Sequence, residues 1–343
     1  MKFDLSYIIL VFFTVLLYGC SAKTNEIDGP DAVSELTSVD IGGIEQWLLM
    51  RGKDVSNPVL LWLHGGPGAA QMPIHHAFTE ELEQEYIVVH WDQRGSGKSN
   101  PAGFDEEAMT FERYLKDVEE VTQHLLERFQ KRKIYLLGHS WGTQLGIRSV
   151  NRTPEYYHAF ISVSQVVHSE KAEKISYEWL KGRVRSSGTE VQMQKFAELG
   201  TPPYKDHDRY VAFAKMKDEF GGGMDEDILT LLKYALQAPE YTIFDYIRWF
   251  DGANRGSGPM WEETRDVDLF SEVPELDLPV WFIVGENDYN TPAELVEEYY
   301  KYVYAPEGKH LIVMEDCSHA PFIGNPDRFN REIIQIKNAL LSK

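Results

Sequence analysis

The feature that most constrains the fold is the pentapeptide Gly138-His139-Ser140-Trp141-Gly142. It lies between the apolar run 134–137, which predicts a buried strand, and the segment 143–152, which predicts a helix. A strand that enters a helix through so short a connection turns sharply, and the two glycines leave room for neighbouring backbone. The sequence therefore predicts a strand–turn–helix unit with Ser140 exposed at its tip. The alternative is a helix start made of small residues, without chemistry at Ser140.

A second glycine-rich loop, His64-Gly65-Gly66-Pro67-Gly68, follows the apolar run 59–63, which predicts a fully buried strand. Glycines at this position let the backbone approach a ligand closely. The backbone N–H groups of Gly66 and Trp141 are therefore candidate donors to a negatively charged oxygen beside Ser140, as in an oxyanion hole. Taken alone, the loop is also explained as a turn without chemistry.

An acid and a histidine complete the parts of a catalytic triad. Asp288 lies just past the apolar run 280–284, and His319 follows the short strand predicted over 310–314. The chain order serine, acid, histidine is that of one known class of triad. In such a triad His319 takes the proton of Ser140, while Asp288 orients His319 and stabilises its charged form.

Two other acids, Glu286 and Asp316, compete with Asp288 for the role of the triad acid. Asp288 is preferred because Thr291-Pro292 begins the next predicted helix shortly after it, which fixes the loop. The nearby Cys317 is interpreted as a buried, inert thiol rather than as a nucleophile.

Strands and helices alternate along most of the chain, which implies a mostly parallel sheet covered on both faces. Segment 165–261 interrupts this alternation with helices separated by Gly/Pro breaks, and predicts a helical cap inserted between core segments 34–164 and 262–343. The expected strands are 34–40, 44–51, 58–63, 86–91, 133–138, 159–164, 279–284 and 310–314. The expected core helices are about 72–84, 110–130, 142–152, 292–304 and 327–341.

Taken together, these blocks resemble α/β-hydrolases of the proline iminopeptidase (prolyl aminopeptidase) type. The resemblance is carried by HGGPG at 64–68, WDQRGSGKS at 91–99 and the tryptophan after Ser140, whereas His139 stands where these peptidases commonly have glycine. Asp92 and Arg94 suit a structural role that ties their loop by charge. The resemblance implies the α/β-hydrolase fold, with a mostly parallel eight-stranded sheet flanked by helices and an inserted helical cap.

The resemblance implies a serine hydrolase that acts through an acyl-enzyme, most specifically an aminopeptidase releasing N-terminal proline or similar residues from short peptides. It implies no cofactor, and no HExxH or CxxC spacing predicts a metal site. In these peptidases acidic cap residues hold the free amine of the substrate. The candidates here are Glu170, Glu178 and Asp245, with Glu173 and Asp251 as further possibilities. A carboxylesterase or lactonase on the same fold, and a non-catalytic binding lipoprotein, are the alternatives.

The N-terminal pattern predicts export. Lys2 precedes the apolar run 8–17, which ends in Leu17-Tyr18-Gly19-Cys20 and looks like a bacterial lipoprotein cleavage box. We expect a signal peptide over 1–19, a lipid on Cys20 and a flexible tether over 20–33. This places the protein in the bacterial cell envelope, periplasmic or surface-exposed. An ordinary signal peptide with a chance cysteine is the alternative.

The charge balance limits the partners. A formal net charge of −20 over 343 residues repels nucleic acid and anionic membranes. We therefore expect no nucleic-acid partner and membrane association only through the lipid anchor at Cys20. The remaining expected partner is a small peptide or ester substrate.

Overall fold

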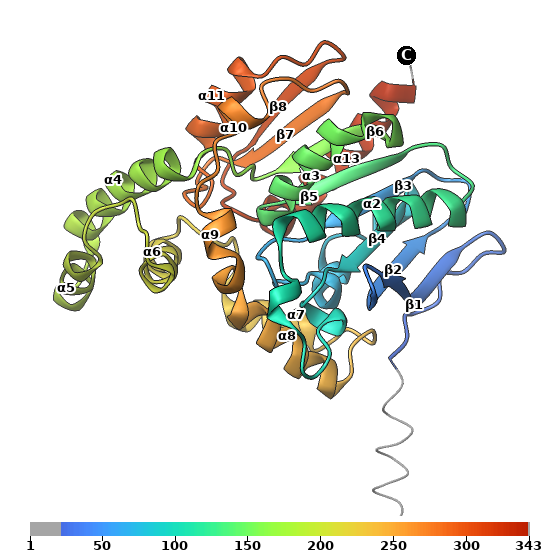
Figure 1. Cartoon of the computed structure of the whole chain (residues 1–343), viewed down its shortest axis with the longest axis horizontal. Coiled ribbons are helices and arrows are strands. Elements are labelled where there is room, and N and C mark those ends of the chain that lie inside the picture. Colours follow the sequence, from blue (N-terminus) through green and yellow to red (C-terminus); the bar gives the residue numbers. More distant parts are fainter. Residues whose placement is uncertain (1–21, 342–343) are drawn as a thin grey trace, which may run out of the picture.

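The computed structural model describes residues 22–341, and an eight-stranded sheet forms its centre (Figure 1). The strand order is β1-β2-β4-β3-β5-β6-β7-β8, in which β1–β2 and β2–β4 pair antiparallel and the other five pairs are parallel. The predicted eight-stranded, mostly parallel sheet is confirmed. Its strands are β1 (Val33–Ile41), β2 (Ile44–Gly52), β3 (Val59–Leu63), β4 (Ile87–Asp92), β5 (Ile134–His139), β6 (Tyr157–Val163), β7 (Val280–Gly285) and β8 (Lys309–Met314).

Apolar side chains pack on both faces of the sheet because successive residues of a strand point to opposite sides. In β3, Leu61 belongs to the core on one face, whereas Trp62 belongs to the core on the other. The first core includes residues of α2 (Phe111–Arg128), α3 (Trp141–Arg152), α10 (Leu269–Glu272) and α11 (Ala293–Tyr302). The second includes residues of α12 (Pro321–Gly324) and α13 (Pro326–Leu341).

The helix predicted over 72–84 is wrong. The segment forms two short 3-10 pieces, η1 (Met72–Ala77) and η2 (Leu82–Gln84), joined by an irregular turn. The first piece ends because the backbone leaves the helical region at Phe78, with φ of −147° and ψ of −3°. Further short 3-10 turns follow at η3 (Gly97–Ser99), η4 (Glu106–Ala108), η5 (Pro154–Tyr156) and η6 (Gly258–Met260).

A helical insertion lies between β6 and β7. It contains α4 (Ser169–Ser187), α5 (Glu190–Leu199), α6 (His207–Glu219), α7 (Ile228–Ala235), α8 (Ile243–Arg255) and α9 (Trp261–Thr264). Helices α4 to α6 extend to one side of the sheet, whereas α7 and α8 lie below it in the view of Figure 1. The first group has a small core of its own, centred on Leu180 and Phe213.

The predicted signal peptide and Cys20 lie outside the described residues. Within the predicted tether, the backbone N–H of Lys23 donates to the carbonyl oxygen of Pro239 at 3.1 Å, and that of Ile27 donates to Ser34 Oγ at 2.8 Å. The tether segment from Lys23 onward is therefore bonded to the folded body. Among residues 22–341, no helix combines the length and the apolar character that crossing a membrane requires.

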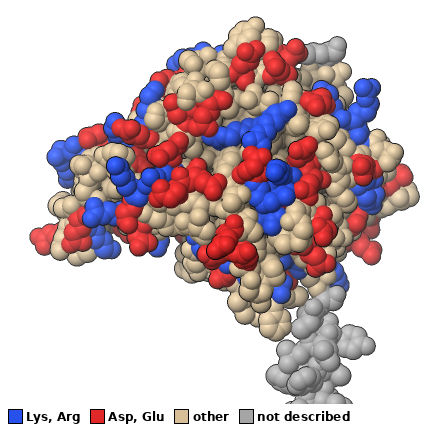
Figure 2. Space-filling model, viewed as in Figure 1, with Lys and Arg blue, Asp and Glu red and all other residues tan. Residues whose placement is uncertain are grey.

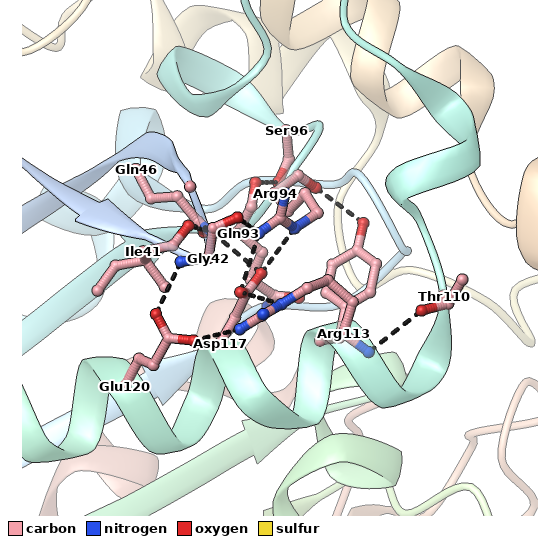
Figure 3. A network of polar contacts seen from close by, with 12 residues as sticks. Ile41, Gly42, Gln46, Gln93, Arg94, Ser96, Thr110, Arg113, Asp117 and Glu120 are labelled. Carbon is pink, nitrogen blue, oxygen red and sulfur yellow. Dashed lines mark hydrogen bonds and ion pairs between the residues drawn. The ribbon is translucent and has the colours of Figure 1, made fainter.

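A buried ion pair joins α2 to the loop after β4 (Figure 3). The Asp117 carboxylate is fully buried and accepts from Arg94 Nε and Nη2 at 2.8 and 3.0 Å. It also accepts from Gln46 at 3.0 Å and from Arg113 at 2.9 Å. Arg94 further donates to the carbonyl oxygen of Gly42 at 3.1 Å. The helix, the β1–β2 turn and the loop are therefore held by one carboxylate.

Replacing Asp117 with alanine leaves the buried Arg94 guanidinium without a counter-charge. We expect the free energy of unfolding to fall by about 3–5 kcal/mol, as measured by urea denaturation. The matched control is Glu112→Ala on the same helix, because Glu112 is exposed and its pair with Arg152 is worth about 0–1 kcal/mol. Equal losses in the two variants would contradict the assigned role of Asp117.

Candidate active site

The turn between β5 and α3 is strained at Ser140, whose φ of 54° and ψ of −117° are unusual for a residue with a side chain. The flanking glycines make this turn possible. A Cβ on Gly138 would lie 2.4 Å from the carbonyl oxygen of Gly142, and one on Gly142 would lie 2.2 Å from that of Leu63. Backbone therefore occupies the space on both sides, as the spacing of the pentapeptide predicts.

Three side chains from three loops meet at this turn. His319 Nε2 lies 2.9 Å from Ser140 Oγ, and His319 Nδ1 lies 2.9 Å from Asp288 Oδ2. Asp288 follows β7 and His319 follows β8, so both lie beyond the carboxyl ends of parallel strands, as Ser140 does. With Nδ1–H donating to the carboxylate, Nε2 is free to accept the hydroxyl proton of Ser140. The arrangement can therefore activate that oxygen for attack on a carbonyl carbon.

The loop after β7 fixes Asp288 in its charged form. The carboxylate is buried and accepts from Asn290 N at 2.8 Å, Thr291 N at 2.9 Å and Thr291 Oγ1 at 2.6 Å. Burial alone would raise the pKa of Asp288, but the charge and hydrogen bond of His319 and the Thr291 hydrogen bonds lower it below its ordinary value. The competing acids Glu286 and Asp316 are exposed.

His139 holds the backbone of His319 in place by a hydrogen bond. Its Nε2–H donates to the carbonyl oxygen of His319 at 2.9 Å, and its Nδ1 accepts from Gln71 Nε2 at 3.0 Å. Gln71 Oε1 in turn accepts from Trp62 Nε1 at 2.7 Å. Burial lowers the pKa of His139 to about 3, so the ring stays neutral and keeps one donor and one acceptor. Ser164 Oγ donates to the same carbonyl of His319 at 2.9 Å.

The two glycine-rich motifs are joined by side chains of the segment 91–99. Gln93 Nε2 donates to the carbonyl oxygen of His64 at 3.0 Å, and Gln93 N donates to His64 Nε2 at 3.2 Å. Gln93 Oε1 accepts from Trp141 Nε1 at 3.1 Å. One glutamine therefore sets the HGGPG loop and the start of α3 at a fixed separation. Arg94, held by Asp117, directly follows it.

A cavity of about 200 Å³ opens beside the three side chains. Ser140 and His319 line it together with Gly66 and Trp141, the predicted oxyanion donors. Gly66 has a φ of +117°, and a Cβ there would lie 2.6 Å from the backbone nitrogen of Gly68, so the loop requires glycine. The volume lies below the roughly 300–1,000 Å³ of pockets for drug-sized ligands, which favours a small substrate.

The insertion contributes three charged groups to the cavity wall: Glu173 of α4, Lys217 of α6 and Arg265, which directly follows α9. Glu173 Oε2 accepts from the backbone N–H of Tyr204 at 2.8 Å, and no cation of the described residues lies within 4.0 Å of the carboxylate. Burial raises the pKa of Glu173. Lys217 Nζ donates to the carbonyl oxygen of Tyr289 at 2.9 Å, linking α6 to the loop that carries Asp288. Burial lowers the pKa of Lys217 to about 8.

The structure does not bring the three predicted cap acids to this cavity. Glu170 and Glu178 are exposed and pair with Lys174 and Lys181 on the same helix. Asp245 is buried against Lys98 at 2.8 Å and also caps the first turn of α8. The correction has a simple physical reason: Glu170 and Glu178 are not on the side of α4 that faces the cavity. That side carries the small residues Ser169, Ala172 and Ser176 together with Glu173.

Other reactive groups lie apart from this cavity. Among residues 22–341, no group of three or more His, Cys, Asp and Glu side chains is arranged to hold a metal ion. Cys317 is buried and does not line the cavity, and burial raises the pKa of its thiol to about 11. Among the described residues, the cavity wall offers hydrogen-bond donors, one carboxylate, one ammonium group and one guanidinium group, but no set of residues typical of a cofactor site.

Comparison with known proteins agrees with this geometry. The model of the alpha/beta hydrolase family matches residues 60–332. The chain belongs to the alpha/beta hydrolase family. The probable aminopeptidase YbaC of Bacillus subtilis is 32% identical over 301 residues, which is 87% of this chain and 94% of the relative. A proline iminopeptidase of Thermoplasma volcanium is 23% identical over 284 residues, which is 80% of this chain and 87% of the relative.

Solved structures show the same fold in proteins that are described by different activities. A proline iminopeptidase-related protein from Thermus thermophilus has a TM-score of 0.58 at 22% identity, covering 90% of this chain and 98% of that protein. A thermophilic esterase from Thermogutta terrifontis has a TM-score of 0.57 at 19% identity, covering 90% and 99%. The resemblance predicted from the sequence motifs is therefore confirmed, and the hydrolase fold alone leaves the substrate open.

Replacing His139 with alanine removes a hydrogen-bond donor to the carbonyl oxygen of His319. It also leaves a gap next to the imidazole ring of His319. We expect kcat to fall about 10–100-fold with a smaller change in KM, because a displaced base affects the chemical step more than binding. His139→Gln, which keeps an N–H donor, is expected to recover part of the loss. Steady-state kinetics on an activated ester, with thermal melting as a fold control, tests this. An unchanged kcat in a folded His139→Ala protein would disprove the support role.

Proposed function

We propose that this hydrolase is a serine aminopeptidase that releases an N-terminal residue, proline or a similar one, from short peptides. The observation that carries the proposal is the unbroken contact from Asp288 through His319 to Ser140, with both distances at 2.9 Å, opening on a small cavity with an unpaired carboxylate. The aminopeptidase names of relatives that span most of the chain support the same activity.

The proposed chemistry uses groups of this chain alone. Ser140 Oγ attacks the carbonyl carbon of the scissile bond while His319 Nε2 takes its proton, and Asp288 stabilises the resulting imidazolium. The oxyanion receives hydrogen bonds from the backbone N–H groups of Gly66 and Trp141. His319 then gives the proton to the leaving amine, which departs and leaves an acyl-enzyme on Ser140. Water attacks this ester by the same steps and frees the enzyme.

Glu173 is the group that favours a peptide with a free amine over an ester. It lines the cavity, it is held by the Tyr204 backbone, and its Oε1 accepts no hydrogen bond from residues 22–341. A carboxylate in a poorly solvated site gains most from a cationic partner, and the ammonium group of a peptide N-terminus supplies one. We therefore assign Glu173 to the substrate amine, in place of Glu170, Glu178 and Asp245.

A carboxylesterase is the second candidate. The esterase from Thermogutta terrifontis supports it, because it has the same fold over most of the chain. An ester substrate would use the same triad and oxyanion donors but would leave Glu173 without a cationic partner. The two candidates therefore differ in whether the substrate needs an amine.

Ser140→Ala tests the proposed nucleophile on two substrates, proline p-nitroanilide and p-nitrophenyl acetate. We expect the wild type to cleave the anilide, and the variant to lose at least about 10⁴-fold in kcat on both substrates because no acyl-enzyme forms. Release of p-nitrophenolate and p-nitroaniline is followed by absorbance. If the wild type cleaves the ester only, the esterase replaces the aminopeptidase. If the variant keeps most of its activity, the triad assignment fails.

Glu173→Gln tests the proposed amine anchor while keeping the shape of the side chain. We expect kcat/KM for proline p-nitroanilide to fall about 10–100-fold, because a hydrogen bond to a charged group is worth about 1.5–3 kcal/mol. Hydrolysis of p-nitrophenyl acetate, which has no amine, is expected to change little.

The matched control for this test is Glu170→Gln, three residues earlier on α4, where the side chain is exposed and pairs with Lys174. This variant is expected to behave as the wild type on both substrates. Equal losses on the anilide and on the ester in Glu173→Gln would instead assign Glu173 to the folding of the cap.

A further inference from the structure

Helix α8 exposes large apolar side chains along one face. Ile243, Phe244, Ile247 and Phe250 are each at least 42% exposed. Their spacings of three and four residues place them on the same side of the helix. The opposite side packs into the protein through Trp249, whose Nε1 donates to the carbonyl oxygen of Ala70 at 2.8 Å. The helix is therefore docked on one face. The face that it leaves uncovered is mainly apolar and also carries the exposed Asp251, which pairs with Arg255.

Helix α7 extends this surface. Ile228 and Leu229 lie in its first turn and Leu236 follows its last, with exposed fractions of 61%, 74% and 70%. The two helices are in contact, because the Tyr246 hydroxyl of α8 donates to the carbonyl oxygen of Ala235 of α7. We call the seven exposed side chains of both helices the α7–α8 face.

This concentration is not the ordinary scatter of apolar residues on a soluble surface. Thirteen large apolar side chains are exposed among the described residues, and seven of them lie on the α7–α8 face. Figure 2 shows few charged side chains at the lower edge of the described surface, where Figure 1 places these helices. A concentration of exposed apolar side chains of this kind marks contact with a protein or a membrane.

The position of Lys23 indicates whether a protein or a membrane covers this face. The backbone N–H of Lys23 donates to the carbonyl oxygen of Pro239, which lies in the short connection between α7 and α8. Cys20, the predicted lipidation site, is three residues before Lys23, and three residues span at most about 11 Å even when fully extended. A lipid on Cys20 would therefore enter the bilayer immediately beside the α7–α8 face.

We propose that the α7–α8 face lies on the surface of a lipid bilayer, as a second membrane contact beside the lipid predicted on Cys20. Helices with one apolar face bind in the interface plane, with that face about 5–10 Å into the boundary between headgroups and acyl chains. The net charge of −20 opposes attraction to anionic lipid, so the contact is apolar rather than electrostatic.

The face is separate from the candidate active site. None of its seven side chains lines the cavity that contains Ser140 and His319. Membrane contact through α7 and α8 therefore requires no change in the triad, and labels on this face leave hydrolysis of a soluble ester intact. The proposal stands or falls independently of the substrate assigned above.

An environment-sensitive fluorophore on the full-length protein tests the contact. Ile247→Cys places the label on the α7–α8 face, and Tyr304→Cys places it at a site with nearly the same exposure, 62% against 61%, between α11 and β8. Cys317 is buried, and labelling of the wild-type protein measures any background from Cys317 and Cys20. Both proteins are reconstituted into phosphatidylcholine vesicles, with and without lipid that carries a quencher at a shallow acyl position. Hydrolysis of p-nitrophenyl acetate confirms that each labelled protein is folded.

We expect the label at position 247 to shift to shorter wavelength on vesicles and to be quenched by the shallow lipid quencher, and the label at position 304 to do neither. An emission at position 247 that stays as in water overturns the proposal. A blue shift at 247 that grows with protein density but is insensitive to the lipid quencher assigns the face to a second copy of the chain, which also overturns it. Quenching at both positions indicates non-specific adsorption and overturns it as well.

Discussion

The close approach of α3 to the end of β3 is the contact on which the site depends. Gly142 lies so near the carbonyl oxygen of Leu63 that a Cβ would come within 2.2 Å of it. Because β3 continues directly into the HGGPG loop, this contact brings the backbone of Gly66 beside that of Trp141. The strained φ of Ser140 follows from the same geometry, since the chain must reverse between β5 and a helix that packs this tightly.

Buried hydrogen bonds and one ion pair fix the position of α3 relative to the end of β3. Apolar packing alone is non-directional and does not set this position. Gln93 bonds to His64 on one side and to Trp141 on the other, and the next residue, Arg94, is fixed by the Asp117 carboxylate. A charged pair of this kind adds little net stability compared with apolar residues of the same size, but breaking it is costly. Its value here is positional: it sets the distance between the two loops that present the candidate oxyanion donors.

The sheet and the proximity of the three triad side chains could be predicted from the sequence because both follow from local patterns. Uninterrupted apolar runs mark buried parallel strands, and functional loops follow the carboxyl ends of such strands, so Ser140, Asp288 and His319 fall at one edge. The break between η1 and η2 was missed because the non-helical backbone of Phe78 leaves no trace in the pattern of apolar residues. The environment of Asp245 was missed because its partner Lys98 is distant in sequence.

Which acid of the cap faces the cavity could not be predicted from the sequence, because it depends on how the cap helices pack. Glu170 and Glu173 differ by less than one helical turn, and a charge count cannot separate them. The row of small residues that accompanies Glu173 is visible in the sequence, but it gains meaning only when α4 is known to cross the cavity. Residues whose roles are set by the strands could thus be identified from the chain, whereas residues whose roles are set by the packing of the insertion could not.

The insertion between β6 and β7 both lines the cavity and exposes an apolar surface. Helices α4 and α6 bring a carboxylate and an ammonium group to the cavity, whereas α7 and α8 turn an apolar surface outward and meet the N-terminal segment at Pro239. The two halves share no lining residue of the cavity, so substrate choice and surface contact can change independently in sequence. The insertion also meets the core away from the ends of β6 and β7, because Tyr241 donates to Asp92 at the end of β4 and Trp249 donates to the carbonyl oxygen of Ala70. A rigid core with a divided insertion is therefore a physical basis for varying the substrate and the location of one hydrolase separately.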